Sequence, residues 1–198
     1  MSNKKELIYQ CAREVFAQKG FKETNVTDIT NMAGVAAGTF YNYYASKDRL
    51  FMEIFAEENV RLKRSILEQV DPDGDPLDVM QRMLLLNEQG IRKNAILREW
   101  YNRESFSRIE KAFREETGMD QIRFMYDSFL DIVKHWQEKG KMRGDISPEM
   151  IMAIFAALVN TDLHKEEIGL EYFPRVLELM SEFVINGLTR NGPGTARA

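Results

Sequence analysis

One short segment in the first quarter of the chain concentrates side chains that could bind a polyanion. These side chains are Thr39, Tyr41, Asn42, Tyr43 and Lys47. Hydroxyl and ammonium groups are suited to phosphate oxygens, and the amide of Asn42 can form two hydrogen bonds with an adenine edge. The segment therefore predicts contacts with double-stranded DNA, in which phosphate contacts set the position and one amide reads a base.

Small and aromatic residues in the same segment support this interpretation. Ala36, Ala37 and Gly38 come first, and their small side chains would let the start of a helix approach phosphates and base edges closely. Phe40 and Tyr44 are four residues apart, so both would lie on the inner face of that helix and anchor it. An ordinary corner between two helices, packed by aromatic residues, is the alternative interpretation.

Two short helices joined by a tight turn must position these groups. Asn25 can cap the first helix, and Asp28 can return a hydrogen bond in a capping-box arrangement. Gly34 ends this helix, a second helix is expected at about 36–44, and Ser46 caps a long third one. This order of elements has the outline of a helix-turn-helix.

Helical periodicity also dominates the rest of the chain, and no run alternates as a strand would. A preceding helix carries an apolar stripe and stops at Gly20, and the turn residues at 71–76 form a loop. Further helices are expected at about 77–90, 95–104, 106–139 with a break at Gly118, 148–159 and 173–189. The sequence therefore predicts an all-α protein.

Composition excludes several other classes of protein. The net charge of −4 is uneven, because residues 1–50 carry +2 and the other 148 residues carry −6. A mildly basic N-terminal part is compatible with a local DNA contact. The single cysteine, Cys11, cannot form an intramolecular disulfide, and no apolar run is long enough for a membrane span or a secretion signal. A cytoplasmic location is therefore expected.

The segment Val26–Phe51 resembles the signature of the tetracycline-repressor (TetR) family of transcriptional regulators. Its sequence is VTDITNMAGVAAGTFYNYYASKDRLF, and the helix before it, with Phe16 and Gly20, is also similar to the family's first helix. The resemblance implies a homodimeric, ligand-responsive DNA-binding regulator, most simply a repressor of a near-palindromic operator, with an activator of the same fold as the alternative. It also implies a three-helix helix-turn-helix DNA-binding domain at 3–62 and a larger helical effector-binding and dimerisation domain at 63–190. The residues of the tail at 191–198 themselves predict disorder.

The same resemblance assigns DNA contacts to individual positions of this chain. Together with Ala36 from the residue types, they are Asn25, Thr27, Ala37, Gly38, Thr39, Tyr41, Asn42, Tyr43 and Lys47. The chain departs from the family pattern at three positions. Ala37 stands where many members carry Lys, Arg or Gln, so one base contact is missing; Thr30 replaces a usual Ala, and Tyr44 a usual Phe.

Two further sets of residues are candidates for the second domain. A pocket for an apolar small-molecule effector is expected from the family, and aromatic and Met residues could line it, with plain core packing as the alternative. These residues are Trp100, Tyr101, Phe106, Phe113, Met125, Tyr126 and Phe129. The acidic second domain argues against a strongly anionic effector.

The apolar run Met150–Val159 and the last helix need cover on several sides, which predicts a dimer interface. Its candidate residues are Ile151, Ile154, Phe155, Leu158, Val176, Met180, Phe183 and Val184. Core packing alone is again the alternative.

An all-α enzyme or interaction module is the competing class. The sequence shows no nucleophile paired with a base and no glycine loop for phosphate. His135 and His164 have no partner at metal-ligand spacing, so neither a metal site nor a cofactor is expected.

Overall fold

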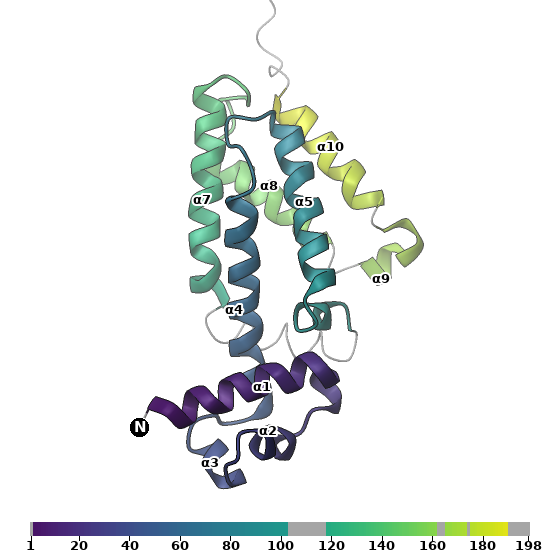
Figure 1. Cartoon of the computed structure of the whole chain (residues 1–198). Coiled ribbons are helices and arrows are strands. Elements are labelled where there is room, and N and C mark those ends of the chain that lie inside the picture. The colour runs from purple at the N-terminus through teal and green to yellow at the C-terminus, as the bar shows by residue number, and fades with distance from the viewer. Residues whose placement is uncertain (1, 103–117, 162–164, 174, 190–198) are drawn as a thin grey trace, which may run out of the picture. The chain divides into compact units, whose positions relative to one another are not determined.

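The computed structural model describes residues 2–102, 118–161, 165–173 and 175–189, and every element in these ranges is a helix (Figure 1). The elements are α1 (Ser2–Glu23), α2 (Val26–Met32), α3 (Ala37–Tyr41), α4 (Lys47–Leu67), α5 (Pro76–Lys93), the 3-10 helix η1 (Leu97–Tyr101), α7 (Gly118–Glu138), α8 (Pro148–Asn160), α9 (Lys165–Ile168), the 3-10 helix η3 (Leu170–Tyr172) and α10 (Arg175–Thr189). The predicted all-α class is confirmed. Within the described ranges, no helix is both long enough and apolar enough to cross a membrane.

The chain divides into two compact units that are interleaved in sequence. The first contains residues 1–65 and 87–122, and the second contains residues 66–86 and 123–198. Helices α4 and α5 each contribute to both units, so a single cut in the sequence does not separate them.

The first unit is built around a core of aromatic and aliphatic side chains from α1 to α4 and η1. The rings of Phe16 and Phe21 both pack on Phe51, with centroids 5.0 Å and 4.7 Å away. Gly20 lets α1 turn sharply just before Phe21, because its φ of 79° lies in the left-handed region that glycine adopts without strain. The predicted stop at Gly20 is therefore a kink, beyond which α1 continues to Glu23.

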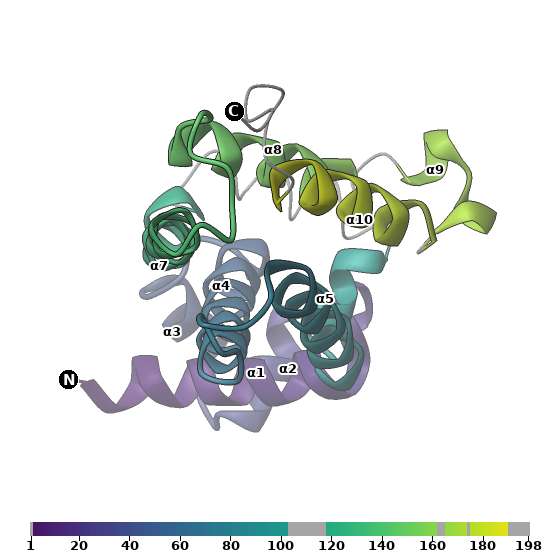
Figure 2. The ribbon, with the colours of Figure 1, turned by 90° about the horizontal axis from the view of Figure 1, so that it is seen from above.

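The second unit has its own core, centred on α7, α8 and α10. Trp136 is fully buried, and its indole N–H donates to the Pro72 carbonyl at 2.8 Å, which ties the loop after α4 to α7. Helices α8 and α10 pack against each other (Figure 2). Ile151 of α8 and Ile185 of α10 are completely buried in this core.

Three predicted elements differ in detail from the structure. The helix expected at 95–104 is the short 3-10 helix η1. Just before it, Asn94 Oδ1 accepts from the N–H groups of Ile96 and Leu97 at 2.9 and 3.2 Å. Helices α9 and η3 were not predicted, because segments of four and three residues are too short to show a helical period. The first part of the helix expected at 106–139 and the tail at 191–198 lie outside the described residues.

Candidate nucleic-acid interface

Reciprocal hydrogen bonds fix the start of α2. The side chain of Asn25 accepts from the Asp28 N–H at 2.8 Å, and the Asp28 carboxylate accepts from the Asn25 N–H at 3.0 Å. This is the predicted capping box, and it is confirmed. Lys19 of α1 bonds the same carboxylate at 2.8 Å and, with the cap, holds the pKa of Asp28 below its usual value.

The turn between α2 and α3 is equally well defined. Gly34 has a φ of 63°, in the left-handed region where glycine is favoured, and the Val35 N–H donates to the Thr30 carbonyl at 3.0 Å. Helix α3 begins after Ala36, whose side chain makes no capping hydrogen bond. It spans only five residues, because Asn42 is already its C-cap, so it is shorter than the helix predicted at 36–44.

Two aromatic side chains hold α3 against the core. Phe40 is fully buried, Tyr44 is 5% exposed, and their ring centroids are 5.8 Å apart. The predicted inner face is therefore confirmed. Burial raises the pKa of Tyr44 to about 12, and within the described residues its buried hydroxyl has no hydrogen-bond partner. Phenylalanine would avoid this cost.

All of the predicted contact residues lie wholly or partly on the surface, and Lys47 is among the partly exposed ones. Tyr41 is 59% exposed and Tyr43 is 37% exposed. A Cβ atom added at Gly38 would meet no atom within 4 Å, so a side chain there would point into open space. The remaining exposed candidates are Asn25, Thr27, Ala36, Ala37 and Asn42, and Thr39 is partly exposed. The packed helices α2 and α3 bring these groups together (Figure 1).

Lys47 is placed differently from the other candidates. Its ammonium donates to the carbonyl oxygens of Phe21 at 2.8 Å and Thr24 at 2.7 Å, and it lies 4.4 Å from the centre of the Phe21 ring. Lys47 thus fastens the end of α1 and the approach to α2 onto the first turn of α4. Sequence reasoning identified its charge but missed these acceptors, which lie more than twenty residues earlier in the chain.

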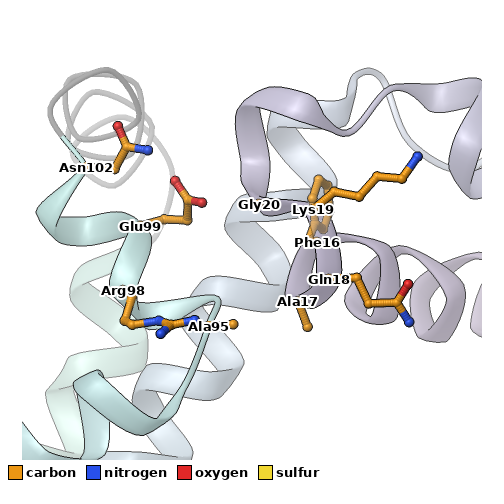
Figure 3. A pocket seen from close by; sticks show the side chains of 9 residues that line it. All are labelled: Phe16, Ala17, Gln18, Lys19, Gly20, Ala95, Arg98, Glu99 and Asn102. Carbon is orange, nitrogen blue, oxygen red and sulfur yellow. The ribbon is translucent and has the colours of Figure 1, made fainter.

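A small polar pocket lies where α1 meets η1 in the first unit. It has a volume of about 350 Å³, and it is lined by Phe16, Ala17, Gln18, Lys19, Gly20, Ala95, Arg98, Glu99 and Asn102 (Figure 3). Glu99 points toward the kink at Gly20, and its carboxylate accepts from the Phe21 N–H at 3.1 Å. This bond connects η1 to the same turn of α1 that Lys47 holds.

Of the seven predicted effector-pocket residues, Tyr126 and Phe129 have described side chains. Phe106 and Phe113, and the side chains of Trp100, Tyr101 and Met125, lie outside the described part of the structure. Phe129 is buried beside Phe155, with ring centroids 5.3 Å apart, whereas Tyr126 is 41% exposed. Phe129 thus packs as core.

The predicted dimer residues fall into two groups. Ile151, Phe155 and Leu158 are buried in the second unit, where they serve as core. Phe183 of α10 is 66% exposed. The other candidates, which are partly buried, are Ile154, Val176, Met180 and Val184.

Among the described residues, no three His, Cys, Asp or Glu side chains come together as metal ligands would. His135 instead bonds Asp73 at 2.7 Å, and this contact holds the pKa of Asp73 below its usual value.

Comparisons with known proteins agree with this architecture. Residues 8–54 match the family model described as bacterial regulatory proteins, tetR family. The HTH-type transcriptional regulator YhgD of Bacillus subtilis is 25% identical over 96% of this chain and 98% of its own length. The HTH-type transcriptional repressor KstR2 of Mycobacterium tuberculosis is 24% identical over 76% of this chain and 74% of its own length.

A solved structure shares the fold over nearly the whole chain. The transcriptional repressor FadR of Thermus thermophilus, in complex with lauroyl-CoA, superposes with a TM-score of 0.59 and 24% identity. The match covers 98% of this chain and 100% of the FadR chain.

Proposed function

The chain belongs to the tetR family of bacterial regulatory proteins, and on this premise we propose that it is a homodimeric repressor that a small molecule releases from DNA. As a member of this family it is a DNA-binding transcriptional regulator and not an enzyme. The observation that carries the proposal is the exposed row of Tyr41, Asn42 and Tyr43, held over buried Phe40. KstR2 and FadR, both named as repressors, support repression over activation.

The mechanism follows from symmetry and linkage. Two copies of α3, one per subunit, would enter successive major grooves of an inverted repeat. The centres of its half-sites would be separated by one helical turn of DNA, ~34–36 Å, or by a multiple of it. Residues 3–62 would bind DNA, and residues 63–190 would bind the effector and the second subunit. An effector that favours another spacing of the two heads would lower operator affinity, with a coupling of about 1–3 kcal/mol. Binding to the chromosome implies a cytoplasmic location.

The exposed apolar side chains of α8 and α10 support the proposed dimer. Phe183 is 66% exposed and Met150 is 57% exposed, so each leaves apolar surface that a second subunit would cover. We expect light scattering to give the mass of a dimer at micromolar concentration and Phe183→Glu to give a folded monomer. Tyr172→Glu, at a residue 57% exposed on η3, is the control and should remain dimeric. A monomeric wild-type protein would overturn the dimer.

Selection from a pool of random-sequence duplexes tests the proposed operator. The proposal predicts that the bound pool converges on an inverted repeat, because two symmetry-related heads read it. Convergence on a single half-site, or no convergence, would contradict the proposed dimeric mechanism.

The fold relationship to FadR with lauroyl-CoA makes acyl compounds the first effectors to test. An acyl chain also agrees with the apolar effector expected from the sequence. Addition of lauroyl-CoA to the preformed complex with the selected repeat should release DNA if the effector is of this class.

A further inference from the structure

Lys63 is a basic side chain of the first unit that the proposed DNA contacts leave unused. It lies on α4 and is partly buried, and its ammonium donates a hydrogen bond to the side-chain carbonyl of Asn87 on α5. Close helix packing holds it there. Gly90 of α5 sits so near Leu62 that a Cβ atom would clash with that side chain. Asn94, the first residue after α5, donates to Glu58 of α4 at 2.7 Å.

Two charged side chains of α4, Glu58 and Lys63, lie along this contact with α5, and in the part of the chain that the structure describes only Glu58 has partners of opposite charge. Glu58 is 6% exposed, and two guanidinium groups bond its carboxylate, Arg13 at 2.6 Å and Arg61 at 3.2 Å. Lys63 lies five residues further along α4, and no carboxylate pairs with it among the described residues. Its hydrogen-bond partner there is a neutral amide. Burial lowers the pKa of Lys63 to about 8. At pH 7 the ammonium is therefore still protonated in most of the molecules.

A desolvated cation beside a neutral amide is a favourable place for an anion. The ammonium has three N–H donors, of which Asn87 takes one, and the Asn87 amide nitrogen is a second donor group next to it. An incoming carboxylate or phosphate oxygen would replace the hydration that burial removed from the ammonium with a charge-assisted hydrogen bond. The nearest buried carboxylate on α4, that of Glu58, is already paired with Arg13 and Arg61. Lys63 therefore remains available for an external anion.

We propose that Lys63, with Asn87 beside it, binds an anionic group of the effector. The inference rests on the proposed ligand-responsive function and specifies the chemistry of its ligand: an apolar body that ends in a carboxylate or carries a phosphate. The acidic second domain leads us to expect that the effector is not strongly anionic. The proposal revises that expectation, since one local cation suffices to bind one anionic group.

The test uses the full-length protein and three probes with the same chain length: laurate, lauroyl-CoA and uncharged dodecanol. Calorimetric titration of the wild-type protein should give at least tenfold tighter binding of laurate or lauroyl-CoA than of dodecanol. Laurate against lauroyl-CoA then separates a carboxylate from a phosphate as the favoured group. Lys63→Met should reduce the preference for the anion to about twofold or less, and Lys63→Arg should retain it.

Two further measurements separate the proposal from a merely structural role of Lys63. Lys93→Met removes an exposed cation of α5 and should keep the wild-type preference. Near pH 8.5, anion binding should raise the pKa of Lys63, so that the wild-type protein takes up a proton and Lys63→Arg takes up none. The inference is overturned by an unchanged anion preference in Lys63→Met, or by a wild-type protein that binds no anion better than dodecanol. DNA binding by the wild-type protein without probe tests the repressor proposal separately.

Discussion

Lys47 donates a hydrogen bond to the carbonyl oxygen of Thr24 at 2.7 Å, one residue before Asn25 caps α2. The first turn of α4 thereby holds the segment from which the helix-turn-helix starts. This relationship gives Lys47 a structural role in addition to the phosphate contact that its charge suggests.

Lys47→Met tests that role, because methionine keeps the hydrocarbon stem and removes the ammonium. The carbonyls of Phe21 and Thr24, both on buried residues, would lose this donor. We expect urea unfolding to show a loss of about 1–3 kcal/mol and a weaker affinity for every duplex. Unchanged stability would contradict the structural role.

Salt dependence of the same variant separates positioning from phosphate contact. A fall in the slope of log affinity against log salt by ~0.9 would mean that the ammonium also reaches one phosphate. An unchanged slope together with lower stability would make Lys47 a positioning residue alone.

Gly38→Val tests the close approach of α3 to DNA. A Cβ atom at this position would lie in open space beyond its own helix and chain neighbours, so we expect an unchanged circular dichroism spectrum and melting temperature. DNA affinity should fall by about tenfold or more, a cost of at least ~1.4 kcal/mol. Gly144→Val, also at an exposed glycine with open space around it, should leave affinity unchanged. Wild-type affinity in Gly38→Val would remove α3 from the interface.

Tyr41→Phe removes one hydroxyl from an exposed side chain and leaves the ring in place. If that hydroxyl donates to a phosphate, the affinity should fall by about 1.5–3 kcal/mol, the range for a hydrogen bond to a charged group. Tyr172→Phe, at a similarly exposed residue of η3, provides the matched control. Equal affinities of Tyr41→Phe and wild-type protein would exclude the contact.

Lys63 makes stability depend on pH in a defined direction. Because its pKa is lowered from 10.5 to about 8 in the folded state, the unfolded chain binds the proton more tightly. The charge therefore destabilises the protein below pH 8, and this cost disappears as the pH rises from 8 to 10.5. We expect Lys63→Met to be more stable than the wild-type protein at pH 7, by about 1–3 kcal/mol. The difference should shrink by pH 10; a difference independent of pH would contradict the burial of the charge.

Local signals in the sequence were sufficient for the helix-turn-helix. Asn25, Asp28 and Gly34 mark the bounds of α2 through short-range hydrogen bonds and backbone conformation, and Phe40 shows which face of α3 is buried. The contacts of Lys47 and Lys63 were not predictable, because their partners lie on other helices and their distances depend on packing. The residues that line an effector site depend on the same long-range packing, so aromatic spacing alone did not separate Phe129, which is core, from Tyr126, which is exposed.

The central claim is that α2 and α3 present a surface that reads DNA sequence. Fluorescence anisotropy with the duplex recovered by selection, beside a scrambled duplex and at several salt concentrations, tests it most directly. The account predicts at least ~10³-fold tighter binding of the selected duplex, a steep fall of affinity with salt, and loss of the preference in Gly38→Val. Weak binding that is equal on both duplexes and unaffected by Gly38→Val would contradict it.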